Sequence, residues 1–216
     1  MKQISIYGAG GCGREVAWLL SSEKNKDKYD LKAYIEDGAK GDSFLNEKPV
    51  LPLNLLKERH PESLISIAVG DPKTRERLVQ KCKKFGFDFA SLIHDSVIMS
   101  DYVKIGNGSI ICCGSIVTVD IEIEEQVHIN FGSTIGHDSR IASYSTISPG
   151  VHVSGNVHIG KRVFIGTGAN IINGTSKKPL IIGDDCVIGA GAAVIENTEP
   201  DSLYAGVPAK LIKRYS

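Results

Sequence analysis

The second half of the chain carries an aliphatic residue at every sixth position. The run starts at Ile93 and continues in phase to Ile171, through Met99, Ile105, Ile111, Val117, Ile123, Ile129, Ile135, Ile141, Ile147, Val153, Ile159 and Ile165. A small or β-branched residue follows many of these by four positions, at Ser109, Ser115, Val127, Ser133, Ser139, Ser145, Val151, Val157, Val163 and Ala169. A period of six fits neither an α-helix nor a flat amphipathic strand. It fits a short strand plus a corner, and so predicts a parallel β-helix in which both kinds of residue point inward.

Three sides to a coil would place residues about eighteen apart in vertical register. Residues 173–179 break the phase, which resumes at Ile182, Ile188 and Val194, so this segment is predicted to project as a loop. Glycine often follows the aliphatic residue, at Gly106, Gly136, Gly160, Gly166, Gly183 and Gly189. We expect these glycines at corners that need a positive φ.

The first ninety or so residues follow a different pattern. Apolar runs at 3–7, 31–35, 64–69 and 87–92 read as strands, and residues 14–20, 53–59 and 73–84 read as helices. Strands that alternate with helices indicate a small parallel sheet with helices on its faces. The sequence therefore predicts two domains, an α/β half-Rossmann-like domain over residues 1–92 and a β-helix over residues 93–216.

A glycine motif follows the first predicted strand. Gly8, Gly10 and Gly13 match G-x-G-x-x-G before a helix, and Glu36 lies about where a ribose-binding acid is expected. A full dinucleotide fold has two mononucleotide halves, for which this domain is too short. Bare N–H groups at a helix N-terminus still suit a diphosphate. We interpret the motif as a nucleotide or nucleotide-sugar cradle, and the alternative is a tight turn that binds nothing.

The pair His137-Asp138 stands out among the repeats. It lies two and three places after Ile135, where a coil turns its corner and side chains face solvent or a neighbouring subunit. A carboxylate beside an exposed histidine can fix its tautomer and stabilise the imidazolium, so the pair can act as a general base. The alternative is an ordinary solvated corner.

Composition narrows the function classes. Lys and Arg total 25 and Asp and Glu total 25, so the formal charge is zero and a nucleic-acid partner is not expected. No apolar run reaches the roughly 18 residues of a membrane span, and no signal peptide is recognisable at the start. Five cysteines without zinc-type pairs, at positions 12, 82, 112, 113 and 186, suit a reducing cytoplasm. We therefore expect a cytoplasmic protein without a membrane partner.

Several motifs occur in one order along the chain: residues 8–13, 34–37, 67–71 with Arg75, the hexads, 136–138 and 205–210. Together they resemble the bacterial sugar acetyltransferases of the sialic acid O-acetyltransferase type, over essentially the full chain. The nearest branch N-acetylates UDP-linked 4-amino-4,6-dideoxy sugars, or GDP-linked perosamine, for glycan assembly. The resemblance implies a left-handed β-helix, a homotrimer, and an active site between adjacent subunits with acetyl-CoA lying along the coils.

The resemblance also implies roles for individual residues. His137 corresponds to the general base and Asp138 to its supporting acid, where the nearest branch commonly has Glu. Thr146 stands where close relatives have a histidine that touches the acetyl group. Positions matching the nucleotide-sugar site are Gly10, Gly11 and Cys12 at the phosphates, Glu36 and Asp37 at the nucleoside, Gly70 in the neighbouring loop, and Asn130 at the sugar. Gly155 and Thr167 match positions expected to meet CoA.

The chemistry needs no nucleophilic side chain, because a thioester is already activated and a neutral sugar amine can attack it directly. The imidazole would accept the proton and a backbone N–H at a corner would bind the oxyanion. Cys112 and Cys113 lack an adjacent histidine to activate them. Carbonic anhydrases on this fold use three histidines, but Ser133 stands where a third ligand would be needed. His152 and His158 lie one hexad apart, on different sides of the predicted prism, so no metal is expected.

Our interpretation is therefore an N-acetyltransferase of a nucleotide-linked, and more specifically UDP-linked, 4-amino-4,6-dideoxy sugar. Two alternatives remain open at this point. One is an O-acetyltransferase of sialic acid or a related sugar, and the other is a non-catalytic trimeric nucleotide-sugar sensor.

Overall fold

The computed structural model describes residues 1–215. The chain forms two compact units that divide between Asp95 and Ser96, slightly beyond the division expected from the sequence. Each unit has its own buried apolar residues.

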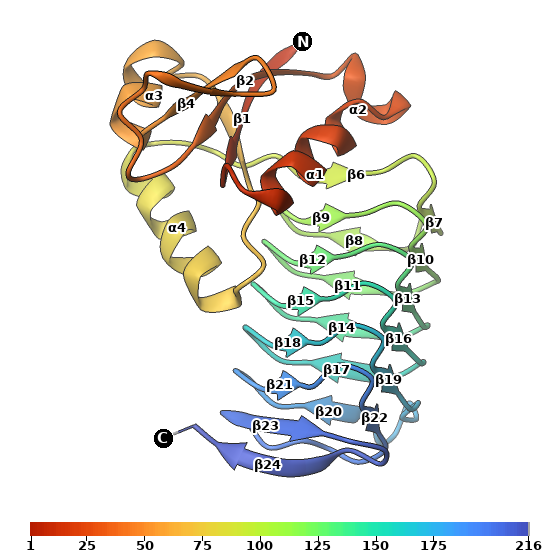
Figure 1. Cartoon of the computed structure of the whole chain (residues 1–216). Coiled ribbons are helices and arrows are strands. Elements are labelled where there is room, and N and C mark those ends of the chain that lie inside the picture. The colour runs from red at the N-terminus through yellow and green to blue at the C-terminus, as the bar shows by residue number, and fades with distance from the viewer. Residues whose placement is uncertain (216) are drawn as a thin grey trace. The chain divides into compact units, whose positions relative to one another are not determined.

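The first unit is a parallel sheet with helices, as predicted (Figure 1). Its strands are β1 (Lys2–Tyr7), β2 (Tyr29–Ile35), β3 (Ser43–Leu45), β4 (Lys48–Leu51) and β5 (Leu64–Ile67). Its helices are α1 (Gly11–Leu20), α2 (Glu23–Lys26), α3 (Leu53–Arg59) and α4 (Pro72–Lys84). The strand order is β3-β4-β2-β1-β5, in which β3 alone runs antiparallel to its neighbour. Ile4, Ile6 and Ile65 are completely buried at its centre, as a two-faced parallel sheet requires.

Some elements of this unit differ from the sequence prediction. The β3–β4 hairpin and α2 were not predicted, and residues 87–92 do not form the expected long strand. That stretch keeps β6 (Leu92–Ile93) and an isolated bridge from Phe89 to Ile65. The hairpin turn places Asn46 and Glu47 at φ 46° and 63°. Two-residue turns of this kind are usually marked by Asn-Gly, and this one lacks the glycine that would have revealed it.

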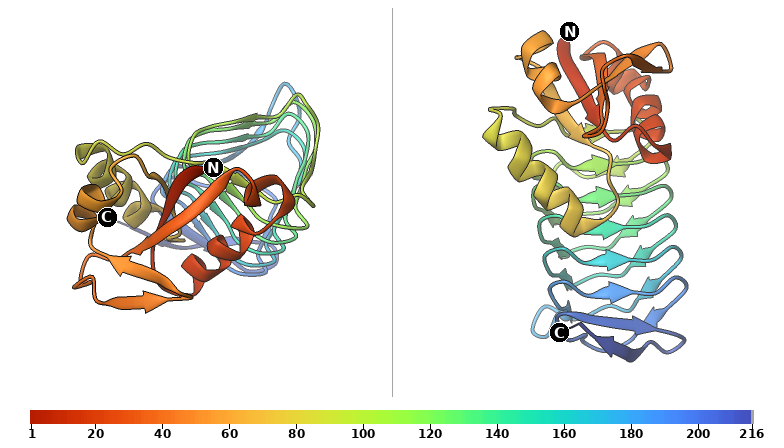
Figure 2. Two further views of the ribbon diagram at one scale, coloured as in Figure 1. Left: turned by 90° about the horizontal axis from the view of Figure 1, so that it is seen from above. Right: turned by 60° about the vertical axis from the view of Figure 1, so that its left-hand side comes forward.

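The second unit is a left-handed parallel β-helix with three sheets, which confirms the prediction from the hexads (Figure 2). One sheet stacks β7 (Ile98–Met99), β10 (Ile116–Val117), β13 (Thr134–Ile135), β16 (His152–Val153), β19 (Asn170–Ile171) and β22 (Ala193–Val194). The next stacks β8 (Lys104–Ile105), β11 (Glu122–Ile123), β14 (Arg140–Ile141), β17 (Val157–Ile159) and β20 (Leu180–Ile182). The third contains β9 (Ile110–Ile111), β12 (His128–Ile129), β15 (Thr146–Ile147), β18 (Phe164–Ile165), β21 (Val187–Ile188), β23 (Ser202–Ala205) and β24 (Lys210–Arg214).

The register between coils follows the repeat. Val117 pairs with Ile135 and Ile135 with Val153, so equivalent residues stack vertically. The small inward positions are completely buried, including Ser109, Ser133 and Ser145. Each of these hydroxyls donates to a backbone carbonyl, for example Ser145 Oγ to Gly160 O at 2.7 Å. A serine can therefore occupy the core because its one donor is satisfied there.

The glycines that follow the aliphatic positions do not have the positive φ that we expected. Their reason is a close approach between coils. A Cβ on Gly136 would lie 2.6 Å from the Gly155 nitrogen, and one on Gly106 would lie 2.4 Å from the Glu124 carbonyl carbon. The positive-φ positions occur two residues later in the corners, at Gly108, Gly114, Gly132, Gly150, Gly168 and Gly191, at Asp120, Asp138, Asn156 and Asp185, and at Gln126, Tyr144 and Arg162.

The break in the repeat is a loop, as predicted. Residues between Ile171 and Leu180 form no strand, and Lys177 and Lys178 are exposed. The loop follows β19 and therefore leaves the prism at the same corner as His137, two coils further along.

Candidate active site

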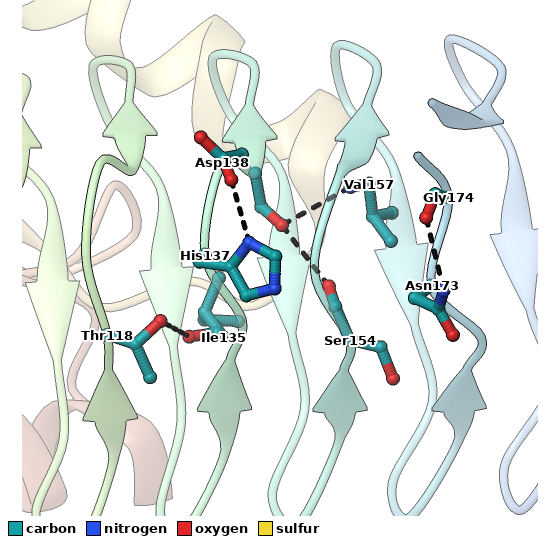
Figure 3. A network of polar contacts seen from close by, with 9 residues as sticks. Thr118, Ile135, His137, Asp138, Ser154, Val157, Asn173 and Gly174 are labelled. Atoms are coloured by element: carbon teal, nitrogen blue, oxygen red, sulfur yellow. Dashed lines mark hydrogen bonds and ion pairs between the residues drawn. The ribbon is translucent and has the colours of Figure 1, made fainter. Parts of the chain in front are cut away.

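His137 and Asp138 form the corner between β13 and β14, and both are open to solvent. The exposed fractions of their side chains are 58% and 55%, and His137 Nδ1 lies 2.7 Å from Asp138 Oδ2 (Figure 3). Asp138 has φ 58°, and the equivalent residues one coil before and after, Asp120 and Asn156, have φ 54° and 56°. Asp and Asn tolerate this left-handed conformation better than other side chains. The corner backbone therefore explains why a short acid suits this position.

The bond to Asp138 decides which ring nitrogen is available. A carboxylate can only accept a hydrogen bond, so Nδ1 of His137 donates and the neutral ring carries its lone pair on Nε2. The ring lies against Gly155, one coil further, because a Cβ on that glycine would be 2.5 Å from Nε2. The His137–Asp138 pair thus presents the lone pair of Nε2 next to Gly155, where the backbone carries no side chain.

The backbone around this pair is held by hydrogen bonds between successive coils. Asp138 N donates to Val119 O at 3.2 Å, and Asn156 N donates to His137 O at 2.8 Å. Within the corner, Ser139 Oγ donates to Ser154 O at 3.3 Å. Among the described residues, the Gly155 N–H has no hydrogen-bond acceptor. Hydrogen bonds between coils thus hold the corner, and the Gly155 N–H is available to a ligand.

An open polar cleft of about 620 Å³ borders Asp138. It is lined by Asp101, Tyr102, Lys104, Asp120, Glu122, Asp138, Arg140, Asn156, His158 and Ser176. Lys104 Nζ lies 3.4 Å from Glu122 Oε1, and Arg140 Nε lies 3.6 Å from Glu122 Oε2. Partial burial, with Arg140 nearby, lowers the pKa of His158. The cleft mixes both charges, so it favours a polar ligand or a polar protein surface over an apolar one.

Three other sequence-predicted residues do not meet His137 within one chain. Asn130 and Thr167 belong to a different corner, the one that follows β12 and β18. Asn130 Nδ2 donates there to Ile147 O at 3.0 Å, and Thr167 is exposed. Thr146 lies on β15 with its side chain buried. Of the residues assigned to the acetyl transfer, one chain brings together His137, Asp138 and Gly155.

The glycine turn of the first unit connects β1 to α1. Gly8 has φ 118°, and a Cβ on Gly13 would lie 1.9 Å from the Gly8 carbonyl oxygen, so a side chain at position 13 is excluded. A Cβ on Gly10 or on Gly11 would meet no atom within 4 Å, so the backbone of these two residues is open. Gly10 caps α1 without a side chain. Open N–H groups at a helix N-terminus are a suitable site for an anion.

The remaining candidates of this unit share one edge of its sheet. Strands β1, β2 and β5 are parallel, and their carboxyl ends lead into residues 8–13, 36–38 and 68–71. β1 lies between β2 and β5, so consecutive connections depart to opposite sides of it. Ligands of open α/β sheets bind at such a switch point. Gly10, Gly11, Glu36, Asp37 and Gly70 therefore lie at the edge where a nucleotide is expected.

Two partners of Asp37 were not found by the sequence analysis. The Tyr7 hydroxyl donates to Asp37 Oδ1, and Lys81 Nζ donates to the same oxygen at 2.6 Å. Burial acts to raise the pKa of this carboxyl, but the hydrogen bonds from Lys81 and Tyr7 outweigh it and hold the pKa below 3.8. No local pattern links these three residues, because they come from β1, α4 and the segment after β2.

Two further side chains lie near the expected nucleotide site, Arg75 at the Gly70 loop and Cys12 in the glycine turn. Arg75 is completely buried, and its Nη1 donates to Val69 O at 2.7 Å and to Gly70 O at 3.2 Å. Cys12 is half-buried, and burial together with Glu15 raises the pKa of its thiol. The buried guanidinium of Arg75 thus holds the backbone of the Gly70 loop in place. The thiol of Cys12 remains neutral at neutral pH.

We expect the stability of Asp37→Asn to fall less steeply than that of the parent protein as the pH is lowered from neutral to acid. The folded pKa of Asp37 is below its ordinary value of 3.8, so its ion-pair stabilisation is complete above that value and is lost as pH falls through the folded pKa. The exposed fraction is 53%, so solvent screening keeps the effect small. Thermal melts of both proteins between pH 7 and pH 3 test this. Curves that converge at neutral pH and separate in acid would contradict the expectation.

The structure also bears on metal and membrane binding. Across residues 1–215, no group of three or more His, Cys, Asp or Glu side chains could hold a metal ion. His152 and His158 lie on different sheets, on β16 and β17, as the repeat predicted. Cys112 and Cys186 are buried. None of the described helices is long and apolar enough to span a membrane.

Comparison with known proteins gives consistent results for both units. Residues 3–82 match the family model of the PglD N-terminal domain. The whole chain is 30% identical to GDP-perosamine N-acetyltransferase of Escherichia coli O157:H7, over 99% of this chain and 98% of that protein. UDP-N-acetylbacillosamine N-acetyltransferase of Bacillus subtilis is 33% identical over 51% of each chain.

A solved structure is similar over nearly its whole length. It is a mutant perosamine N-acetyltransferase from Caulobacter crescentus in complex with CoA and GDP-perosamine. The TM-score is 0.88 and the identity 28%, covering 99% of this chain and 98% of that one. The similarity therefore extends over both units, the glycine turn and the His137 corner included.

Proposed function

Because the chain belongs to the family of N-acetyltransferases that act on nucleotide-linked 4-amino sugars, we propose that it acetylates the 4-amino group of a UDP-linked 4-amino-4,6-dideoxy sugar for bacterial glycan assembly. Acetyl-CoA is the acyl donor. The observation that carries the catalytic part is the exposed His137–Asp138 pair, whose Nε2 faces an open backbone. Family membership favours an amide product and sets aside the alternatives of an ester-forming enzyme or a sensor.

In the proposed reaction the neutral sugar amine attacks the carbonyl carbon of the thioester. A C–N bond forms, and His137 Nε2 takes a proton from the nitrogen. The tetrahedral oxyanion then collapses, the C–S bond breaks, and the CoA sulfur leaves with the proton returned by the imidazolium. Asp138 holds the Nδ1 proton throughout and stabilises the charged ring, which is the role of the third member of an acid–base triad.

The oxyanion needs a donor near the base. We assign this to the N–H of Gly155, the residue against which the His137 ring lies, because this N–H has no acceptor among the described residues. Removing an oxyanion donor typically costs about 10²–10³ in rate, so a donor in this position matters. The remaining cofactor contact is assigned to the exposed Thr167 and the sugar contact to Asn130, whereas the side chain of Thr146, which the sequence also offered for the cofactor, is buried within the chain and is not accessible to it.

The nucleotide is assigned to the first unit. The diphosphate is placed on the open N–H groups of the glycine turn, with Gly10, Gly11 and Cys12, and the nucleoside beside Glu36, Asp37 and Gly70. Asp37 Oδ1 already accepts hydrogen bonds from Tyr7 and Lys81, so Oδ2 is the oxygen left to accept from a nucleobase. Uracil presents one imide N–H, which a single carboxylate oxygen can accept. The free oxygen of Asp37 is therefore compatible with the proposed uridine.

A homotrimer is part of the proposal. Asn130 and Thr167 lie at a different corner from His137, so one chain alone does not assemble the whole set. Ile98 on β7 and Ile116 on β10 expose 66% and 38% of their surface on one sheet, which gives neighbouring subunits an apolar contact. Light scattering should give about three times the chain mass of 23.3 kDa. A monomer with full activity would contradict a shared site.

The proposal is tested with a substrate panel. Free CoA release is measured with acetyl-CoA and UDP- or GDP-linked 4-amino-4,6-dideoxy sugars, and with sialic acid. We expect the highest kcat/KM for a UDP-linked amine, and an alkali-stable product that is heavier by one acetyl group. Preference for the GDP-linked amine would overturn the uridine assignment alone. An alkali-labile product would overturn N-acetylation.

A further inference from the structure

The corner that carries His137 has a column of equivalent residues running through successive coils. Val119, His137, Gly155 and Asn173 occupy the second place after the inward aliphatic residue in four consecutive coils. The imidazole of His137 does not extend straight out from its own coil. Its ring lies against the next member of the column, Gly155.

The imidazole ring of His137 occupies the space that a side chain at position 155 would fill. A Cβ on Gly155 would lie 2.5 Å from His137 Nε2, 2.6 Å from Cε1 and 2.8 Å from Cδ2. All three nearest atoms therefore belong to the imidazole. Real Cβ contacts are not this short, because carbon and nitrogen atoms at optimal separation are about 3.5 Å or more apart. Any side chain at position 155 would displace the ring.

The backbone gives no other reason for a glycine here. Gly155 is absent from the positive-φ positions of the chain, so its conformation is open to other residues. Gly106, Gly136 and Gly166, by contrast, meet the main chain of the next coil, and a Cβ on Gly166 would lie 2.6 Å from the Ala190 nitrogen. At Gly155 the close neighbour is a side chain, and it is the candidate base.

We infer that Gly155 is a positioning residue for His137: its lack of a side chain lets the imidazole lie against the coil with Nε2 beside the Gly155 N–H. This rests on the proposed role of His137. The following coil, as well as Asp138, then sets the position of the His137 ring. The base and the oxyanion donor come together because Gly155 has no Cβ. Asp138 fixes the tautomer, and Gly155 fixes where the ring lies.

Gly155→Ala tests the inference, because alanine keeps the N–H and adds only the excluded methyl group. The ring must move by roughly 1 Å, and a misplacement of that size can cost about 100-fold in rate. We expect kcat to fall about 100-fold while KM for acetyl-CoA changes less than about threefold, since the backbone donor remains. The melting temperature and the oligomer mass should stay close to those of the parent protein.

A double-mutant cycle separates positioning from a structural or cofactor role. With His137→Ala in place there is no ring to displace, so adding Gly155→Ala should lower the residual rate far less than the roughly 100-fold expected in the parent background. In the parent background, the side-chain ¹⁵N and ¹H signals of His137 should shift on Gly155→Ala. Gly166→Ala is the control, because its methyl group meets backbone and should lower stability without moving those signals.

The outcomes are distinct. Parent-like kcat and unshifted His137 signals in Gly155→Ala would overturn the inference. An equal loss of rate in both backgrounds would show that Gly155 acts through the cofactor or the fold, which also overturns it. If His137→Ala is fully active, the proposed role of His137 as the base fails instead, while the shift of the histidine signals in Gly155→Ala still reports whether Gly155 places the ring.

Discussion

Replacing His137 by alanine should lower kcat by at least about 100-fold, because positioned general bases contribute about 10²–10⁴ to rates. The side chain is more than half exposed and its neighbours are the exposed Asp138 and a glycine, so we expect a change in unfolding free energy of no more than about 0.5 kcal/mol. Steady-state CoA release gives the rate, and denaturant unfolding with light scattering gives stability and assembly. An unchanged kcat would remove His137 from the mechanism.

Asp138→Asn is the companion variant. Asparagine tolerates the left-handed φ of 58° at this position, so the corner should keep its backbone. The amide can donate to Nδ1 and so favour the wrong tautomer, with no charge left to stabilise the imidazolium. We expect a smaller loss than for His137→Ala, of about 10- to 100-fold in kcat. Loss of folding in this variant would instead make Asp138 a structural residue.

Gly13→Ala should have the largest effect on the first unit. The added methyl group would lie 1.9 Å from the Gly8 carbonyl oxygen, and both atoms belong to the turn between β1 and α1. Neither can move without opening that turn, so we expect a loss of about 3 kcal/mol or more, at the upper end of overpacking effects. Chemical denaturation followed by Trp18 fluorescence reports on this unit, since the single tryptophan is on α1.

Gly10→Ala is the matched control in the same turn. A Cβ at this position meets no atom within 4 Å, and φ of −87° suits any residue. The fold should lose less than about 1 kcal/mol, since alanine is only a poorer helix cap. If the diphosphate lies on this turn, the methyl group should raise KM for the nucleotide sugar about tenfold, equivalent to about 1.4 kcal/mol. A parent-like KM would place the diphosphate elsewhere.

Much of the fold could be predicted because its signals are local. The six-residue period fixes which side chains enter the prism, and so places His137 and Asp138 outside it without knowledge of any contact. The βα pattern with Gly8 and Gly13 likewise predicts a strand, a tight turn and a helix. The β3–β4 hairpin was missed because Asn46-Glu47 lacks the usual glycine.

The β-helix, the α/β unit, the glycine turn and the exposed His-Asp corner are all encoded locally, since each depends on residues close together in the chain. Only the folded arrangement reveals that Gly136 and its equivalents serve close coil contacts rather than positive φ, that Tyr7 and Lys81 hold Asp37, and that His137 rests on Gly155. These are contacts between residues far apart along the chain. They depend on the stacking distance between coils and on the volume each side chain fills, and no periodic pattern encodes either quantity.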